Sequence, residues 1–127
     1  MKITMFLLLF LLILHFVHII EEIAGDAWFI ADVYGSTKTF IIIMIVLYII
    51  PLIFFYLFLN NNKFAFYLIF IYISIMILDG IVHVIEMIIM KKYINGAAGL
   101  FSGIGFIIVG LLLFHYLRKE WYDKSTG

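Results

Sequence analysis

Residues 3–24 read ITMFLLLFLLILHFVHIIEEIA, an apolar run that carries histidines and glutamates only near its end. The unbroken apolar part ends at residue 20, and three more apolar runs follow at residues 40–59, 64–89 and 97–117. A helix needs about 20 residues to cross a bilayer, and none of the runs alternates in polarity as a barrel strand does. The sequence therefore predicts an all-α polytopic membrane protein with four transmembrane helices.

The composition excludes a water-soluble domain. Of the 127 residues, 67% are hydrophobic and 13% are charged, and the mean hydropathy is +1.25. A soluble chain of this length has too small an interior for so much apolar surface. We expect residues 1–127 to form a single four-helix transmembrane domain in contact with the lipid bilayer. The net charge of zero indicates no nucleic-acid partner, and the lack of cysteine excludes disulfides and thiolate ligands.

The connections between the runs are short, at residues 25–39, 60–63 and 91–96. Pro51 predicts a kink in the second helix, and the string GLFSG at residues 99–103 has the small-residue spacing that predicts close helix packing. Basic residues are more numerous on the side that holds the termini, so the positive-inside rule predicts cytoplasmic termini in a multi-pass protein of the cell membrane. The five cations on that side are Lys2, Lys63, Arg118, Lys119 and Lys124, against Lys38, Lys91 and Lys92 on the other.

A short repeat relates the two halves of the chain. The string HIIEE at residues 18–22 is echoed by HVIEM at residues 83–87, and both strings lie late in an odd-numbered run. We interpret the halves, residues 1–62 and 63–127, as copies of one helical hairpin. Two spans per copy keep the same orientation, so the copies would be related by an axis along the membrane normal.

Two clusters of acids and histidines interrupt the first and third runs. An ionisable side chain at the centre of a membrane helix costs about 2.5–3.5 kcal/mol, so such residues tend to be paired and functional. At about 100° per residue, the polar side chains of each run fall on one stripe, with Glu21 at its margin. We expect the two stripes to form one pocket between the first and third helices. The clusters are His15, His18, Glu21, Glu22 and Asp26 in the first run, and Asp79, His83 and Glu86 in the third, where Tyr72 falls on the same stripe.

Histidine nitrogens and carboxylate oxygens at these spacings can bind one metal ion. We therefore expect an enzyme that acts on a lipid-like substrate. Its pocket holds either a divalent metal such as iron or zinc or, without a metal, the same groups as a proton relay or an acid–base pair. Two alternatives stay open, namely a proton- or cation-coupled carrier and an accessory subunit whose polar groups only pair helices. Four spans make a thin shell around a pocket, which leaves a homo-oligomer open as well. The candidate metal ligands are His15, His18, Glu22, Asp79, His83 and Glu86, and the candidate catalytic residues are His18, Glu21, Glu22, His83 and Glu86.

The string HIIEE in a first apolar span resembles the small bacterial integral membrane proteins named after the HXXEE motif. In that family a later helix carries a histidine, and a Tyr-x-Pro-Gly-x-x-Thr-like stretch opens the last span. Here Tyr93 and Gly96 match that stretch, whereas Asn95 and Gly99 stand in the places of its proline and threonine. The resemblance implies an enzyme site but no particular reaction. The site residues that it implies are His18, Glu21, Glu22 and His83.

Overall fold

The structure is a computed structural model that describes residues 2–126, with side chains for residues 3–122. Within this range the chain is helical apart from short connections, and it contains no strand. Four of its helices are long and apolar enough to cross a membrane. The prediction of an all-α polytopic membrane protein is therefore confirmed. In chain order the elements are α1 (Lys2–Ala24), α2 (Trp28–Tyr34), α3 (Thr37–Leu59), α4 (Lys63–Met90), η1 (Tyr93–Ala97) and α5 (Leu100–Thr126).

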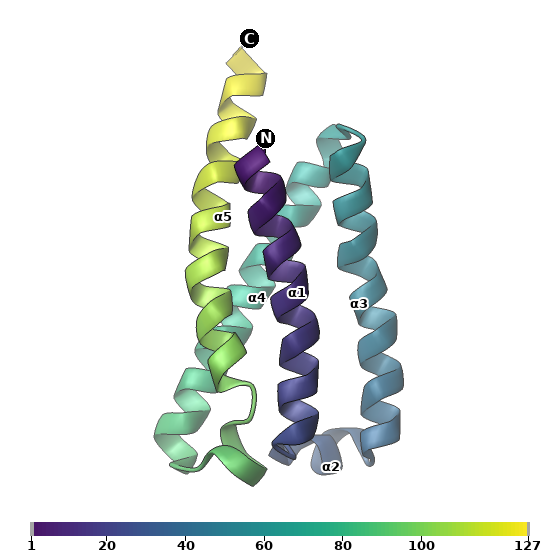
Figure 1. Cartoon of the computed structure of the whole chain (residues 1–127), viewed down its shortest axis with the longest axis vertical. Coiled ribbons are helices and arrows are strands. Elements are labelled where there is room, and N and C mark those ends of the chain that lie inside the picture. Colours follow the sequence, from purple (N-terminus) through teal and green to yellow (C-terminus); the bar gives the residue numbers. More distant parts are fainter. Residues whose placement is uncertain (1, 127) are drawn as a thin grey trace.

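The four long helices stand side by side, and the chain runs up and down through them (Figure 1). Both termini lie at one end of the bundle, while α2 crosses the opposite end beneath α1 and α3. The connection η1 lies at that same end, where the Asn95 N–H donates to the Gly25 carbonyl oxygen at 2.9 Å. Each predicted repeat half thus holds two spans and one connection at the α2 end. The duplication and the membrane orientation stay predictions, and the side chains of Lys2 and Lys124 lie outside the described ones.

Local signals explain where the helices begin and end. The Ser36 hydroxyl accepts the Thr39 N–H at 3.2 Å and so caps α3, and the Asn62 side chain caps α4 in the same way through the Phe64 N–H at 2.9 Å. Gly35 ends α2 in the left-handed region, with φ of 72°. The prediction that residues 25–39 form only a connection is wrong, because α2 lies within them.

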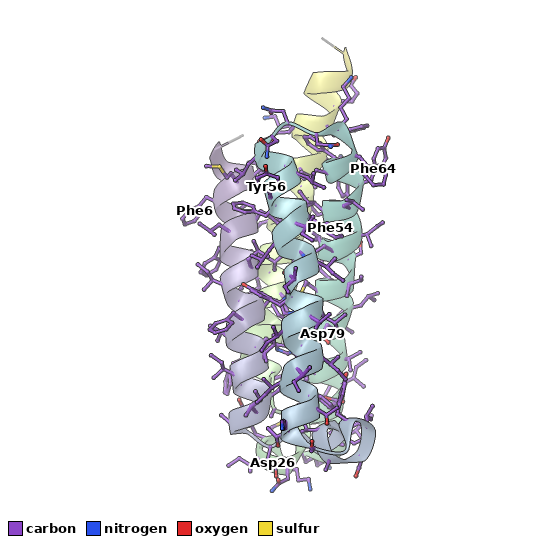
Figure 2. The ribbon with its side chains drawn as sticks, turned by 90° about the vertical axis from the view of Figure 1, so that its right-hand side faces the viewer. Phe6, Asp26, Phe54, Tyr56, Phe64 and Asp79 are labelled. Atoms are coloured by element: carbon purple, nitrogen blue, oxygen red, sulfur yellow. The ribbon has the colours of Figure 1, made fainter. Side chains whose placement is uncertain are left out.

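The bundle is packed most tightly where α4 meets α5. Gly80 lies so close to the Gly103 carbonyl that a Cβ at position 80 would overlap with it, which confirms the close packing predicted from GLFSG. The window of α3 that could cross a membrane is only 11% buried, against 39% for α5. The outer faces are apolar, and Figure 2 shows Phe6 and Phe64 projecting outward from α1 and α4. These faces suit contact with the lipid bilayer, and α3 is the most peripheral span.

Candidate functional site

Four polar side chains from α1 and α4 converge inside the bundle. His18 Nε2 lies 3.1 Å from Glu22 Oε1 and 3.1 Å from Asp79 Oδ2. His83 Nε2 lies 3.4 Å from the same Glu22 oxygen. One ligand atom each from His18, Asp79 and His83 falls within 4.8 Å of the others. The structure therefore brings together the two predicted stripes, with Glu22 between the two imidazoles and His18 between two carboxylates.

This His/carboxylate cluster lies at membrane depth and is largely shielded. His18, Glu22 and His83 are 4%, 5% and 2% exposed, whereas the Asp79 side chain is 36% exposed. Along the bundle, Figure 2 shows Asp79 between the midpoint and the α2 end, and Asp26 at that end. Asp26 is therefore separate from the cluster, although the sequence placed it on the same stripe.

Glu86 extends the cluster toward α2. One of its oxygens accepts the indole N–H of Trp28 at 3.1 Å. The other, Oε2, lies 3.2 Å from His83 Nδ1, but the two atoms are not aligned for a hydrogen bond. Both atoms are buried without a hydrogen-bond partner among the described residues. Buried polar groups without a hydrogen bond are costly at membrane depth.

Glu21 points away from the cluster and binds the beginning of α5. Its carboxylate accepts the backbone N–H groups of Phe101 at 3.0 Å and Ser102 at 2.9 Å, and the Tyr93 hydroxyl at 2.5 Å. The first N–H groups of a helix have no partner within it and favour negative charge. Partial burial and the neighbouring Glu21 carboxylate raise the pKa of Tyr93 to about 12. The two glutamates of HIIEE therefore have different environments, because Glu22 faces the cluster and Glu21 joins α1 to α5.

Ser102, which is not among the predicted site residues, connects these two environments. Its hydroxyl donates to the Glu21 carboxylate, and its Oγ lies 2.8 Å from His18 Nδ1. A serine hydroxyl has one proton to donate, so with that proton directed at Glu21 the Oγ accepts from His18 Nδ1–H. The lone pair of a neutral His18 then lies on Nε2, the atom that faces Glu22 and Asp79. The serine inside GLFSG was the one signal in the sequence.

Gly99 allows the chain to pass directly over both imidazoles. Its φ is +106°, and an added Cβ would lie 2.7 Å from His18 Cε1 and 2.8 Å from His83 Cε1. Only glycine adopts this conformation at little cost and leaves this space. The start of α5 therefore covers the cluster with backbone instead of a side chain.

His15 contacts a different group of residues from the other predicted ligands. Its Nδ1 lies 3.1 Å from the Tyr72 hydroxyl, and its ring packs edge-on against Tyr48 at a centroid distance of 5.1 Å. Both His15 and Tyr72 face the cavity described next. The structure thus places His15 beside the cluster of four, and the Tyr72 hydroxyl lies with it at the cavity wall.

A cavity of about 650 Å³ opens beside the cluster, between α1, α3 and α4, with α2 across one end. Its walls are mainly apolar, and the described residues that line it include three carboxylates and three imidazoles but no Lys or Arg. The volume lies within the range of small-molecule sites. The histidines and carboxylates that line the cavity are His15, His18, Glu22, Asp79, His83 and Glu86.

Comparisons of this chain with protein-family models, with curated proteins and with solved structures found no match. The function of this chain is therefore inferred from the geometry of the cluster and of the cavity.

Proposed function

We propose that this protein is a membrane-embedded enzyme that binds a divalent metal at His18, Glu22, Asp79 and His83 and acts on a lipid-like substrate. The observation that carries this proposal is the spacing of the four donors. Metal–ligand distances of about 2.0–2.2 Å place neighbouring ligands of a tetrahedral site about 3.3–3.6 Å apart. Of the six separations among the four donors, His18–Glu22 and His18–Asp79 are each 3.1 Å and His83–Glu22 is 3.4 Å. The ligand atoms of His18, Asp79 and His83 all lie within 4.8 Å of one another. A zinc or ferrous ion would fit among them with small side-chain adjustments.

The charge of the cluster supports a bound cation. Glu22 and Asp79 carry two negative charges when ionised, and no Lys or Arg lines the adjoining cavity within the described side chains. Uncompensated carboxylates are unfavourable in a medium of low dielectric constant. A divalent ion held by two carboxylates and two neutral imidazoles makes a neutral site.

Ser102 supports the same assignment. Histidines that bind a metal almost always donate their other ring N–H to a fixed acceptor, which orients the ring. His18 does so through Nδ1 to Ser102 Oγ, and Ser102 is held in turn by Glu21. A metal at the cluster would activate a water molecule or polarise a carbonyl oxygen of the substrate. Glu86 and His15, which face the cavity beside the four ligands, are the candidate acid–base groups.

The cavity favours an enzyme over the two alternatives. A carrier needs a polar route across the membrane, but the segment of the described bundle beyond the cluster is filled by apolar side chains such as Leu8, Leu12 and Ile73. An accessory subunit needs paired polar groups but no cavity beside them. The apolar walls of the cavity suit the hydrocarbon part of a lipid.

Two further assignments belong to this proposal. The chain is a member of the HXXEE-motif family, on the strength of HIIEE, the second histidine and the Tyr93–Gly96 match. It lies in the cell membrane with cytoplasmic termini, so the site occupies the half of the bilayer away from the cytoplasm. A reporter fused to the C-terminus tests this orientation, because a periplasmic signal would contradict it.

Elemental analysis of the purified protein tests the metal. The comparison is between wild type, the double variant His18→Ala/His83→Ala, the milder Asp79→Asn, and His115→Ala as a matched control. His115 is an exposed histidine on α5 that lies far from the cluster. We expect near-stoichiometric iron or zinc in wild type and the control, and its loss in the double variant. Absence of metal from wild type grown with metals supplied and purified without chelators would refute the metal centre.

A further inference from the structure

The cavity has the polarity and the extent of one membrane leaflet. Along α4 its lining runs from Ile71 to Glu86, about 22 Å at 1.5 Å per residue. One leaflet with its head groups is about half of a bilayer of about 40–45 Å, or about 20–22 Å, so a cavity that begins at the head-group level on the α2 side reaches about the bilayer centre. Its three carboxylates and the imidazoles of His18 and His83 gather toward the α2 end. The part near the bilayer centre is lined mainly by apolar residues, which include Ile50, Pro51, Phe54 and Ile71, and the Tyr72 hydroxyl in that part lies 3.1 Å from His15 Nδ1.

This order matches a lipid of the leaflet on the α2 side. Such a lipid holds its polar group near α2 and extends its hydrocarbon chain toward the bilayer centre. α3 forms one wall of the cavity and is the least buried of the four spans. A chain in the cavity would therefore lie between the packed core and the surrounding lipid, without crossing water.

The α2 end of the cavity restricts the polar group. Trp28, Phe29, Val33 and Tyr34 of α2 line that end, so mainly apolar and aromatic side chains stand where a large hydrated head group would extend. The lining described by the structure has no Lys or Arg to pair with a phosphate, and its carboxylates would repel a phosphate wherever no cation neutralises them. Phospholipid head groups are therefore disfavoured by both size and charge.

We propose that the cavity binds a membrane lipid with a small, uncharged, oxygen-bearing polar group, namely a hydroxyl, carbonyl or ester, and that this lipid is the substrate. The oxygen lies at the His/carboxylate cluster and the chain follows α3 and α4 toward the bilayer centre. That it is a substrate rests on the proposed function, but its binding does not depend on the metal.

Photo-crosslinking in nanodiscs tests the proposal. The probes are a long-chain alcohol with a mid-chain diazirine and a phosphatidylglycerol with the same labelled chain, each with and without unlabelled alcohol as competitor. Met44 faces the cavity, whereas its neighbour Ile45 is 58% exposed on the outer face of α3. The variant Met44→Trp fills the cavity, and Ile45→Trp is the matched control.

We expect the alcohol probe to label peptides around residues 50–54 and 71–75, and unlabelled alcohol to compete. Labelling should fall several-fold in Met44→Trp and stay unchanged in Ile45→Trp. Equal labelling in both variants, or equal labelling of the cavity by the phospholipid probe, would overturn the proposal. If crosslinking fails but the purified protein contains the metal, the lipid proposal is overturned and the metal centre is not. If the alcohol probe labels the cavity but the protein contains no metal, only the metal centre is overturned.

Discussion

Replacing Gly99 with alanine tests whether the start of α5 holds the two imidazoles in place. The added Cβ would lie 2.7 Å from His18 Cε1, 2.8 Å from His83 Cε1 and 2.9 Å from His83 Nε2. Neither ring can retreat easily, because His18 is hydrogen-bonded through Nδ1 to Ser102 and His83 is almost fully buried. The substitution should therefore disturb the fold and the cluster together.

The expected loss has two parts. A non-glycine residue with positive φ costs about 1–2 kcal/mol, and overpacking of a filled site costs about 1–3 kcal/mol. Gly35→Ala is the matched control, because its φ is +72° but no atom lies within 4 Å of the added Cβ. The gain from a less flexible unfolded chain is about 0.4–1 kcal/mol in both variants and cancels between them. We expect Gly99→Ala to lose about 1–3 kcal/mol more stability than the control.

The assay is reversible unfolding by sodium dodecyl sulfate in mixed micelles, followed by circular dichroism, with metal content measured on the same samples. Gly99→Ala should unfold at a lower detergent fraction than Gly35→Ala and should hold less metal. Equal stabilities of the two variants, with unchanged metal content, would refute the placement of Gly99 over the imidazoles.

Three further predictions concern other parts of the bundle. Ser102→Ala removes the acceptor for His18 Nδ1, so metal affinity measured by competition with a chelator should fall about 10–100-fold. The control is Ser74→Ala, which loses only a hydrogen bond to the Phe70 carbonyl oxygen of its own helix. Equal metal affinities of the two variants would contradict the role of Ser102. Gly80→Ala places a Cβ against the Gly103 backbone and should cost about 1–3 kcal/mol in the same unfolding assay, whereas Gly105→Ala meets only the flexible Leu14 side chain and should cost less. Because the pKa of Tyr93 is raised to about 12, its contribution to stability is complete below about pH 10 and is lost as the pH rises to about 12. The loss of stability over that range should be smaller in Tyr93→Phe, and identical pH profiles would contradict the raised pKa.

Helical periodicity predicts most of the residues of the His/carboxylate cluster but not the partners of Glu21. Helical spacing placed His18, Glu22, Asp79 and His83 on two stripes, and a membrane helix has few ways to hold such groups except against each other. The same angles put Glu21 only at the margin of its stripe, and its partners are backbone groups of α5 some 80 positions further along the chain. No local pattern in either segment records that contact.

The sequence predicted the spans better than it predicted the ends of the helices and the short helix α2. The predicted fourth run ended at residue 117, where apolar residues give way to charged ones, but α5 continues to Thr126. Hydropathy indicates where the membrane-spanning part ends, whereas a helix can continue beyond it as long as its residues have high helix propensity. The short helix α2 was missed because its seven residues are too few for a clear period, and Ile30 is held instead by packing near Phe40 and Ala98.

By itself, the sequence determined the class of this protein, its four spans and most of the residues at its polar centre. Length and hydropathy suffice for the spans, because lipid offers no partner for backbone groups and so each apolar run must satisfy its own hydrogen bonds. Only the tertiary structure decided that Glu21 binds the start of α5, that Ser102 and Gly99 shape the cluster, and that a cavity lies beside it against α3. These features depend on which helices approach one another and how closely, and that is set by side-chain packing between segments far apart in the chain.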